Sequence, residues 1–116
     1  MEVTHTFAGV PVANFGAAYD WYERLFGRPA DMRPHNREAV WRLTPNGSVY
    51  VVEDSERAGS GLVTLALNDL DAHEERLRDD ALTFTEAHDA PPRRVVVRDI
   101  DGNTLTLFQD PAASGD

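Results

Sequence analysis

Cysteine is absent from this chain of 116 residues, and lysine is absent too, because all 11 basic residues are arginines. The first absence excludes disulfides, thiolate nucleophiles and zinc–thiolate sites. The second excludes Schiff-base chemistry and lysine-anchored pyridoxal phosphate. The sequence also contains no phosphate-binding loop, dinucleotide fingerprint or Gly-x-Ser-x-Gly nucleophile motif. The range of reactions open to the protein is therefore narrow.

Positive charge and long apolar runs are also scarce. The net charge of −9 repels the phosphate backbone of nucleic acids, and it favours a cationic guest if it does more than keep the protein soluble. No apolar run approaches the ~20 residues of a membrane span, and the N-terminus lacks the basic-then-apolar layout of a signal peptide. We therefore expect one cytoplasmic globular domain with neither nucleic acid nor membrane as a partner.

The pattern of expected elements occurs twice along the chain. Each half starts with an alternating strand, continues with a helix and ends with short strands. The segments 12–15 and 67–70 match at an offset of 55 residues, and the turns at Asn46-Gly47 and Asp101-Gly102 show the same offset. We predict module one over about 3–54, a polar linker over about 54–60, module two over about 61–110 and a C-terminal tail over 111–116.

Capping residues place the two expected helices. Asn14 is a suitable N-cap for the first, and Gly27 ends it. Asp71 and Glu74 predict a capping box at the start of the second, where we expect His73 to be exposed. The expected strands cover 3–12, 38–43, 48–53, 61–67, 82–86, 94–98 and 104–109.

One helix covers only one face of a module's sheet and leaves the other face free. Alternation in the last strand places Thr104, Thr106 and Phe108 on one face and two leucines on the other. His5 and Phe7 share a face of the first strand in the same way. The sequence therefore predicts an α+β fold of two tandem βαβββ modules whose concave sheets form a cleft.

Several motifs resemble the vicinal oxygen chelate superfamily, which includes glyoxalase I, extradiol dioxygenases, fosfomycin-resistance enzymes and bleomycin-resistance proteins. These motifs lie at 12–15, 21–27, 67–72 and 98–103, so the resemblance covers almost the whole chain. It implies paired βαβββ modules, often assembled as a dimer. It does not select a reaction, because this fold hosts several chemistries as well as binding alone.

In the enzymes of this superfamily, a divalent metal lies in the cleft, held by His, Gln or Glu from the first and last strands of each module. The resemblance places Phe7 and Leu62 at the first-strand positions and Thr106 at one last-strand position. The other falls at Val51, or at Tyr50 if the turn carries one extra residue. Apolar side chains and neutral hydroxyls are poor ligands for a divalent ion.

His5 and Glu53 could supply a metal site only if this alignment were wrong. The resemblance implies that their two strands run parallel. Since they lie two residues from Phe7 and Val51 in opposite directions, they would then stand ~13 Å apart along the strand axis. We therefore expect no metal and no other cofactor.

The same faces contain the candidate ligand-binding residues. Phe7 and Phe108 offer rings for stacking on a planar ligand, while hydroxyl, imidazole and carboxylate groups would fix its orientation. Trp41 is either a ligand contact or a core residue, because alternation alone does not decide which face it occupies. The candidate residues are Phe7, Phe108, Thr106, Thr104, Glu53, His5 and Trp41, none of them catalytic.

Three functions are compatible with these candidate residues. The leading hypothesis is a metal-independent homodimer, similar to the bleomycin-resistance branch, that sequesters an aromatic or cationic drug or metabolite and so confers antibiotic resistance. The alternative is a metal-dependent lyase, isomerase or dioxygenase that polarises a substrate oxygen. The third is a metal-free enzyme with His5 or Glu53 as a general base, for which the sequence offers no partner.

Overall fold

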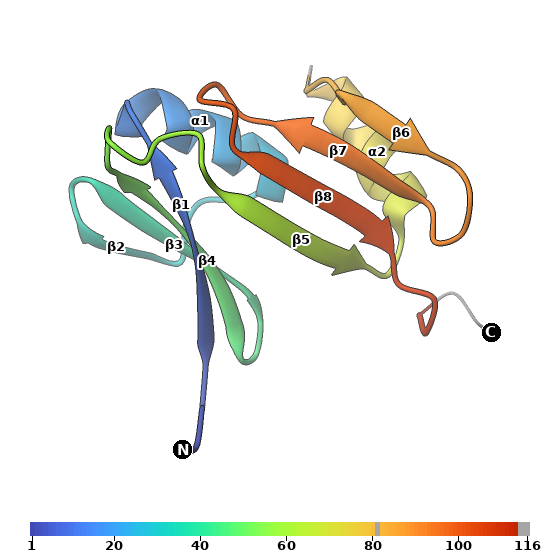
Figure 1. The fold of residues 1–116 in the computed structure, drawn as a ribbon, viewed down its shortest axis with the longest axis horizontal. Coiled ribbons are helices and arrows are strands. Elements are labelled where there is room, and N and C mark those ends of the chain that lie inside the picture. The colour runs from blue at the N-terminus through green and yellow to red at the C-terminus, as the bar shows by residue number, and fades with distance from the viewer. Residues whose placement is uncertain (81, 114–116) are drawn as a thin grey trace.

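The computed structural model describes residues 1–80 and 82–113, and residues 114–116 of the predicted C-terminal tail lie outside this part. The described residues form two βαβββ modules in tandem, which is the predicted α+β fold (Figure 1). Its elements are β1 (Thr6–Val12), α1 (Phe15–Phe26), β2 (Met32–His35), β3 (Glu38–Thr44), β4 (Gly47–Glu53), β5 (Leu62–Leu67), α2 (Leu70–Asp79), β6 (Glu86–His88), β7 (Arg94–Arg98) and β8 (Thr104–Gln109). No helix within the described ranges is long and apolar enough to cross a membrane.

Each module folds into its own four-stranded sheet, in the order β1-β4-β3-β2 or β5-β8-β7-β6. The first strand of each module pairs in parallel with the last, and the remaining pairs are antiparallel. β1 and β5 are therefore edge strands. They approach each other near Pro11 and Gly61 and diverge from there (Figure 1).

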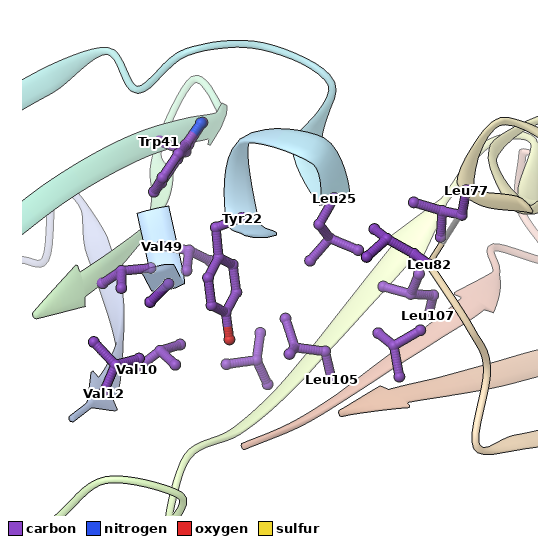
Figure 2. Packing of buried hydrophobic residues seen from close by; sticks show 14 of the residues in the cluster. Val10, Val12, Tyr22, Leu25, Trp41, Val49, Leu77, Leu82, Leu105 and Leu107 are labelled. Atoms are coloured by element: carbon purple, nitrogen blue, oxygen red, sulfur yellow. The ribbon is translucent and has the colours of Figure 1, made fainter. Parts of the chain in front are cut away.

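Both helices contribute to one hydrophobic core shared by the modules. On α1, Tyr22 and Leu25 are buried, and Leu25 belongs to the same buried cluster as Leu77 of α2 and Leu107 of β8 (Figure 2). Burying each such side chain stabilises the fold by about 1.5–3 kcal/mol. The other face of each sheet has no helix on it, and we call it the open face.

The helix ends agree with the sequence prediction for α1 but not for α2. Asn14 accepts a hydrogen bond from Ala17 N, and Gly27 has φ of 77°, a conformation that glycine adopts without strain. At α2 the N-cap is Asp69, so the capping box predicted at Asp71 was wrong. Glu74 is buried and accepts instead from Arg93 Nη1 at 2.9 Å and from Arg78 Nη2.

One strand prediction was wrong, and the offset between the modules is not constant along the chain. The strand expected over 82–86 is β6 at Glu86–His88, because Leu82 packs into the core. Module two also has one more residue in its last turn than module one. Phe7 pairs with Ser48, whereas Leu62 pairs with Thr104, so the 55-residue offset of the first strands becomes 56 in the last strands.

The segment 98–103, which the sequence marked as a motif, joins the two modules. Asn103 is fully buried, and its amide donates to Pro11 O and to Asp99 Oδ2, both at 2.8 Å, while its Oδ1 accepts from Gly61 N at 2.7 Å. Tyr22 Oη donates to the same Asp99 oxygen at 2.8 Å. Burial and then the charge of Asp99 raise the pKa of Tyr22, so its hydroxyl stays protonated and keeps donating.

A second set of hydrogen bonds links the two helices to each other. Arg76 of α2 donates to the carbonyl oxygens of Arg24 and Leu25, which are free because α1 ends there. Its charge also suits the negative end of the α1 dipole. These bonds and the 98–103 segment hold both helices on the same side of the molecule, so the open faces are left on the other.

Candidate functional site

The open faces contain most of the predicted site residues, in two groups. His5 and Phe7 lie on the open face of the first sheet, where 59% of Phe7 is exposed. Thr104, Thr106 and Phe108 lie half-exposed on the open face of the second sheet. The structure thus brings the members of each group together but places the two groups on different sheets.

The strand register decides between Tyr50 and Val51. Gly9 pairs with Tyr50, as Thr64 pairs with Thr106 in module two, so Tyr50 is the residue equivalent to Thr106. Val51 is fully buried toward α1. The ring of Tyr50 lies over Gly9 so closely that a Cβ there would stand 2.6 Å from the phenol oxygen.

The four positions at which the superfamily enzymes hold a metal are therefore Phe7, Tyr50, Leu62 and Thr106. None offers a carboxylate or an imidazole, and Leu62 is 82% exposed. In residues 1–80 and 82–113, no three His, Asp or Glu side chains lie close enough together to hold a metal ion. This set of side chains does not fit a divalent metal.

Glu53 lies on the helix side of the sheet and not on the open face. Its Oε1 accepts from Phe15 N at 3.2 Å, at the start of α1, and its Oε2 is 3.6 Å from Arg37 Nε. Gln109 does the same in module two by accepting from Leu70 N at 2.9 Å. Glu53 is on this side because it alternates with Tyr50 and Val52, so its carboxylate caps a helix.

Trp41 also faces the helix side and is fully buried. Its Nε1 donates to Arg28 O at 2.9 Å, and its ring centroid lies 5.2 Å from that of Phe26 and 5.4 Å from that of Tyr19. Of the two roles that the sequence left open for Trp41, the structure favours the core residue.

A pocket of about 450 Å³ opens on the first sheet beside His5 and Phe7, and we call it the module-one pocket. The two rings are tilted by 36° to one another with centroids 4.6 Å apart, and His5 Nε2 lies 2.8 Å from Ser48 Oγ. Several of its residues were not predicted from the sequence. Two of them, Val40 and Arg42, could have been placed opposite the helix, because they alternate with Trp41. Its lining residues are His5, Phe7, Asp31, Met32, Val40, Arg42 and Ser48.

Asp31 carries the carboxylate of this pocket and is already bonded within the chain. Arg42 N donates to its Oδ2 at 2.6 Å, and Arg28 Nη1 lies 2.8 and 2.9 Å from its two oxygens. The hydrogen bond from the Arg42 backbone has the largest effect on the pKa of Asp31, and together with the bond from Arg28 it lowers that pKa. The carboxylate is therefore ionised at neutral pH, with Arg28 as its counter-ion.

A second cavity, of about 430 Å³, lies between the modules and is lined by residues of both β3 and β5. Its lining is mainly aliphatic and includes Leu43 and Leu65. His73 also lines it and is half-buried, so the prediction that this histidine is exposed was wrong. Burial and then the charge of Arg76 lower the pKa of His73, which keeps its ring neutral at pH 7.

Comparison with known proteins adds structural relatives. No protein-family profile matches the chain, and no curated protein sequence does. A glyoxalase/bleomycin resistance protein from Catenulispora acidiphila is 35% identical in sequence, with a TM-score of 0.88 over 92% of this chain and 98% of that one.

Two more distant structures show the same fold. TnmS3, an antibiotic binding protein from a Streptomyces species, is 24% identical with a TM-score of 0.74, over 94% of this chain and 98% of its own. TioX from a Micromonospora species is 24% identical with a TM-score of 0.75, over 90% and 97%. At this level of identity the likeness shows the fold alone.

Proposed function

Because this chain belongs to the glyoxalase/bleomycin resistance protein family of the vicinal oxygen chelate superfamily, we propose that it binds a small aromatic molecule without a metal ion and releases it unchanged. Such a protein acts by sequestering its ligand, and we propose an antibiotic as that ligand. TnmS3, which is described as an antibiotic binding protein, has the same fold.

One observation carries the metal-independent part of the proposal. The side chains at the four positions used for metal binding in the superfamily are a phenyl, a phenol, an isobutyl and a hydroxyl group, at Phe7, Tyr50, Leu62 and Thr106. They are poor metal ligands but good contacts for a flat apolar molecule. Affinity would then come from stacking and apolar enclosure, with a few hydrogen bonds for orientation.

We propose that the ligand binds between two copies of the chain. Within one chain, Phe7 and Phe108 lie on the open faces of different sheets. A homodimer that sets the first sheet of one subunit against the second sheet of the other would make a cleft with one aromatic residue from each. A monomeric mass in solution at micromolar concentration would refute this assembly.

The experiment has two parts. The protein is loaded in turn with manganese, iron, cobalt, nickel and zinc, dialysed at neutral pH and analysed for metal; we expect no stoichiometric retention. Aromatic compounds are then screened by thermal shift with and without a chelator, and bound compounds are recovered for mass spectrometry. We expect binding that survives the chelator and compounds of unchanged mass. Retention of one ion per site, or consumption of the compound, would favour the enzyme hypotheses instead.

Two variants test the aromatic contacts. Phe7→Ala and Phe108→Ala should each weaken binding of a stacked compound by about 1 kcal/mol or more, since aromatic pairs contribute ~0.5–1.5 kcal/mol beyond area burial. Ile100→Ala, a change to a side chain that is 66% exposed and outside the site, is the control. Unchanged affinity in both phenylalanine variants would move the site away from the open faces.

A further inference from the structure

The module-one pocket contains a cationic side chain without an ion-pair partner in the described part of the chain. Arg42 alternates with the helix-facing Trp41 and Leu43, so its guanidinium lies on the open face and lines the pocket. In the described part of the chain, no ion pair with an Asp or Glu side chain includes Arg42. The Arg42 hydrogen bond to Asp31 is made by the backbone N–H, and the guanidinium acts on this carboxylate through its charge alone.

The one acidic charge in the lining of the pocket already has a counter-ion. Asp31 is the only carboxylate in its lining, and Arg28 is its counter-ion at 2.8 Å. Glu38, two residues before Val40 on the same face of β3, is not one of the lining residues, and its Oε1 lies 3.0 Å from His35 Nε2. The lining residues together with Arg28 therefore carry one net positive charge, from Arg28 and Arg42 against Asp31, although the whole chain has a net charge of −9.

A second donor lies on the same wall. His5 Nε2 is engaged by Ser48 Oγ at 2.8 Å. When the Ser48 hydroxyl donates in this bond, the proton of the neutral imidazole is on Nδ1, which can donate to a ligand. The ring of Phe7 and the side chains of Met32 and Val40 supply apolar surface next to these donors.

This combination fits a planar anion. A guanidinium binds a carboxylate through two parallel N–H···O bonds, and charge-assisted bonds of this kind are about twice as strong as neutral ones. A volume of about 450 Å³ is within the range of small-molecule pockets and accommodates one or two fused rings.

We propose that the module-one pocket selects an aromatic carboxylate, with its ring against Phe7 and its carboxylate on Arg42. This inference rests on the proposed function and names the ligand class of that site. It differs from the expectation of a cationic guest, which came from the net charge of the whole chain. The charges that line the pocket decide recognition, because at physiological ionic strength charges beyond ~8 Å are largely screened.

The test uses three probes with the same ring system and different charge: 2-naphthoate, 2-naphthamide and 2-naphthylmethylammonium. Affinities are measured by calorimetry at pH 7.5. We expect 2-naphthoate to bind about tenfold more tightly than the amide, and the cation to bind least tightly. Arg42→Gln should remove the preference for 2-naphthoate and leave the affinity for 2-naphthamide unchanged.

Two further variants serve as controls. Arg57→Gln makes the same change in net charge at a side chain that is 79% exposed and outside the pocket, and it should keep the preference. Arg42→Lys should restore part of it, because an ammonium keeps the charge but not the fork of donors. Since the bond from the Arg42 backbone to Asp31 does not depend on the side chain, these variants should fold.

Each contrary result has a distinct meaning. If the cationic probe binds as tightly as 2-naphthoate, the inference fails while the proposed function stands, because an aromatic ligand still binds. A preference for 2-naphthoate that persists in Arg42→Gln would also overturn the inference, since the carboxylate would then bind elsewhere. If none of the probes binds at millimolar concentration, the inference fails, and so does the proposed aromatic site on the open face.

Discussion

Replacing Asn103 should weaken the protein more than its small side chain suggests, because that side chain joins the modules. It is fully buried and makes three hydrogen bonds, with Pro11 O, Asp99 Oδ2 and Gly61 N. Asn103→Ala removes all of them. Pro11 O keeps the donor Gly59 N at 3.4 Å, and Asp99 Oδ2 keeps Tyr22 Oη, whereas Gly61 N has no other bond in the described structure.

The expected loss of stability depends on which of these three groups is left without a hydrogen-bond partner. A buried donor left without a partner costs about 1–3 kcal/mol, and two weakened acceptors add to this, so we expect a loss of about 2–4 kcal/mol in the free energy of unfolding. This is a large share of the roughly 5–15 kcal/mol of a typical domain. Asn103→Asp, which keeps the shape but presents an anion to Pro11 O and Asp99, should cost at least as much.

The measurement is urea unfolding followed by tryptophan fluorescence, which reports on the buried Trp41. Asn68→Ala, at an exposed asparagine, is the matched control and should cost less than ~0.5 kcal/mol. Tyr22→Phe removes the other donor to Asp99 Oδ2, so combined with Asn103→Ala it should lose more than the sum of the single changes. A loss in Asn103→Ala no larger than in the control would refute the view that this segment joins the modules.

Three further predictions concern other parts of the chain. Gly59→Ala should destabilise by ~1 kcal/mol or more because its φ is 92° and its Cβ would collide with the backbone oxygen of Asp101, whereas Gly16→Ala, with the nearest atom at 3.7 Å, should be neutral or stabilising; unfolding midpoints compare the two. Glu53→Ala should cost ~1 kcal/mol through the loss of its bond to Phe15 N, and Glu53→Gln much less; equal losses would contradict the capping role. Because the folded-state pKa of His73 is lowered, the unfolded chain binds its proton more readily, so its contribution to stability is complete above pH ~6.5 and falls as the pH drops through the folded pKa. Urea midpoints at pH 5 and 7.5 should differ less in His73→Gln than in the parent; an unchanged difference would exclude this histidine as the cause.

Much of the fold could be predicted because its signals are local. Asn14 and Gly27 define α1 through backbone bonds within a few residues, and the strand alternation of Thr104, Thr106 and Phe108 needs only neighbours in sequence. The start of α2 was predicted less well, because three acidic residues, Asp69, Asp71 and Glu74, could each serve a helix end. Only the packing of Glu74 against Arg93 showed which of them was free to cap.

The candidate site was predicted in part, for a related reason. His5, Phe7 and Phe108 lie on open faces as alternation indicated, but Glu53 does not, because one extra residue in the last turn of module two shifts the alignment between the modules. Arg42 and Asp31 were missed as partners in the module-one pocket. They are 11 residues apart in sequence, and the pairing of β2 with β3 brings them together.

The sequence by itself determined the two-module α+β architecture, the narrow range of possible chemistry and the aromatic character of the open faces, since composition and periodicity act residue by residue. Only the tertiary structure decided which side each alternating residue faces, that the 98–103 segment joins the modules, and which charges in the module-one pocket are already paired. Those outcomes depend on strand register and on contacts between residues far apart in the chain, such as the 77 positions between Tyr22 and Asp99. Such contacts form only when the chain folds, so no local pattern encodes them.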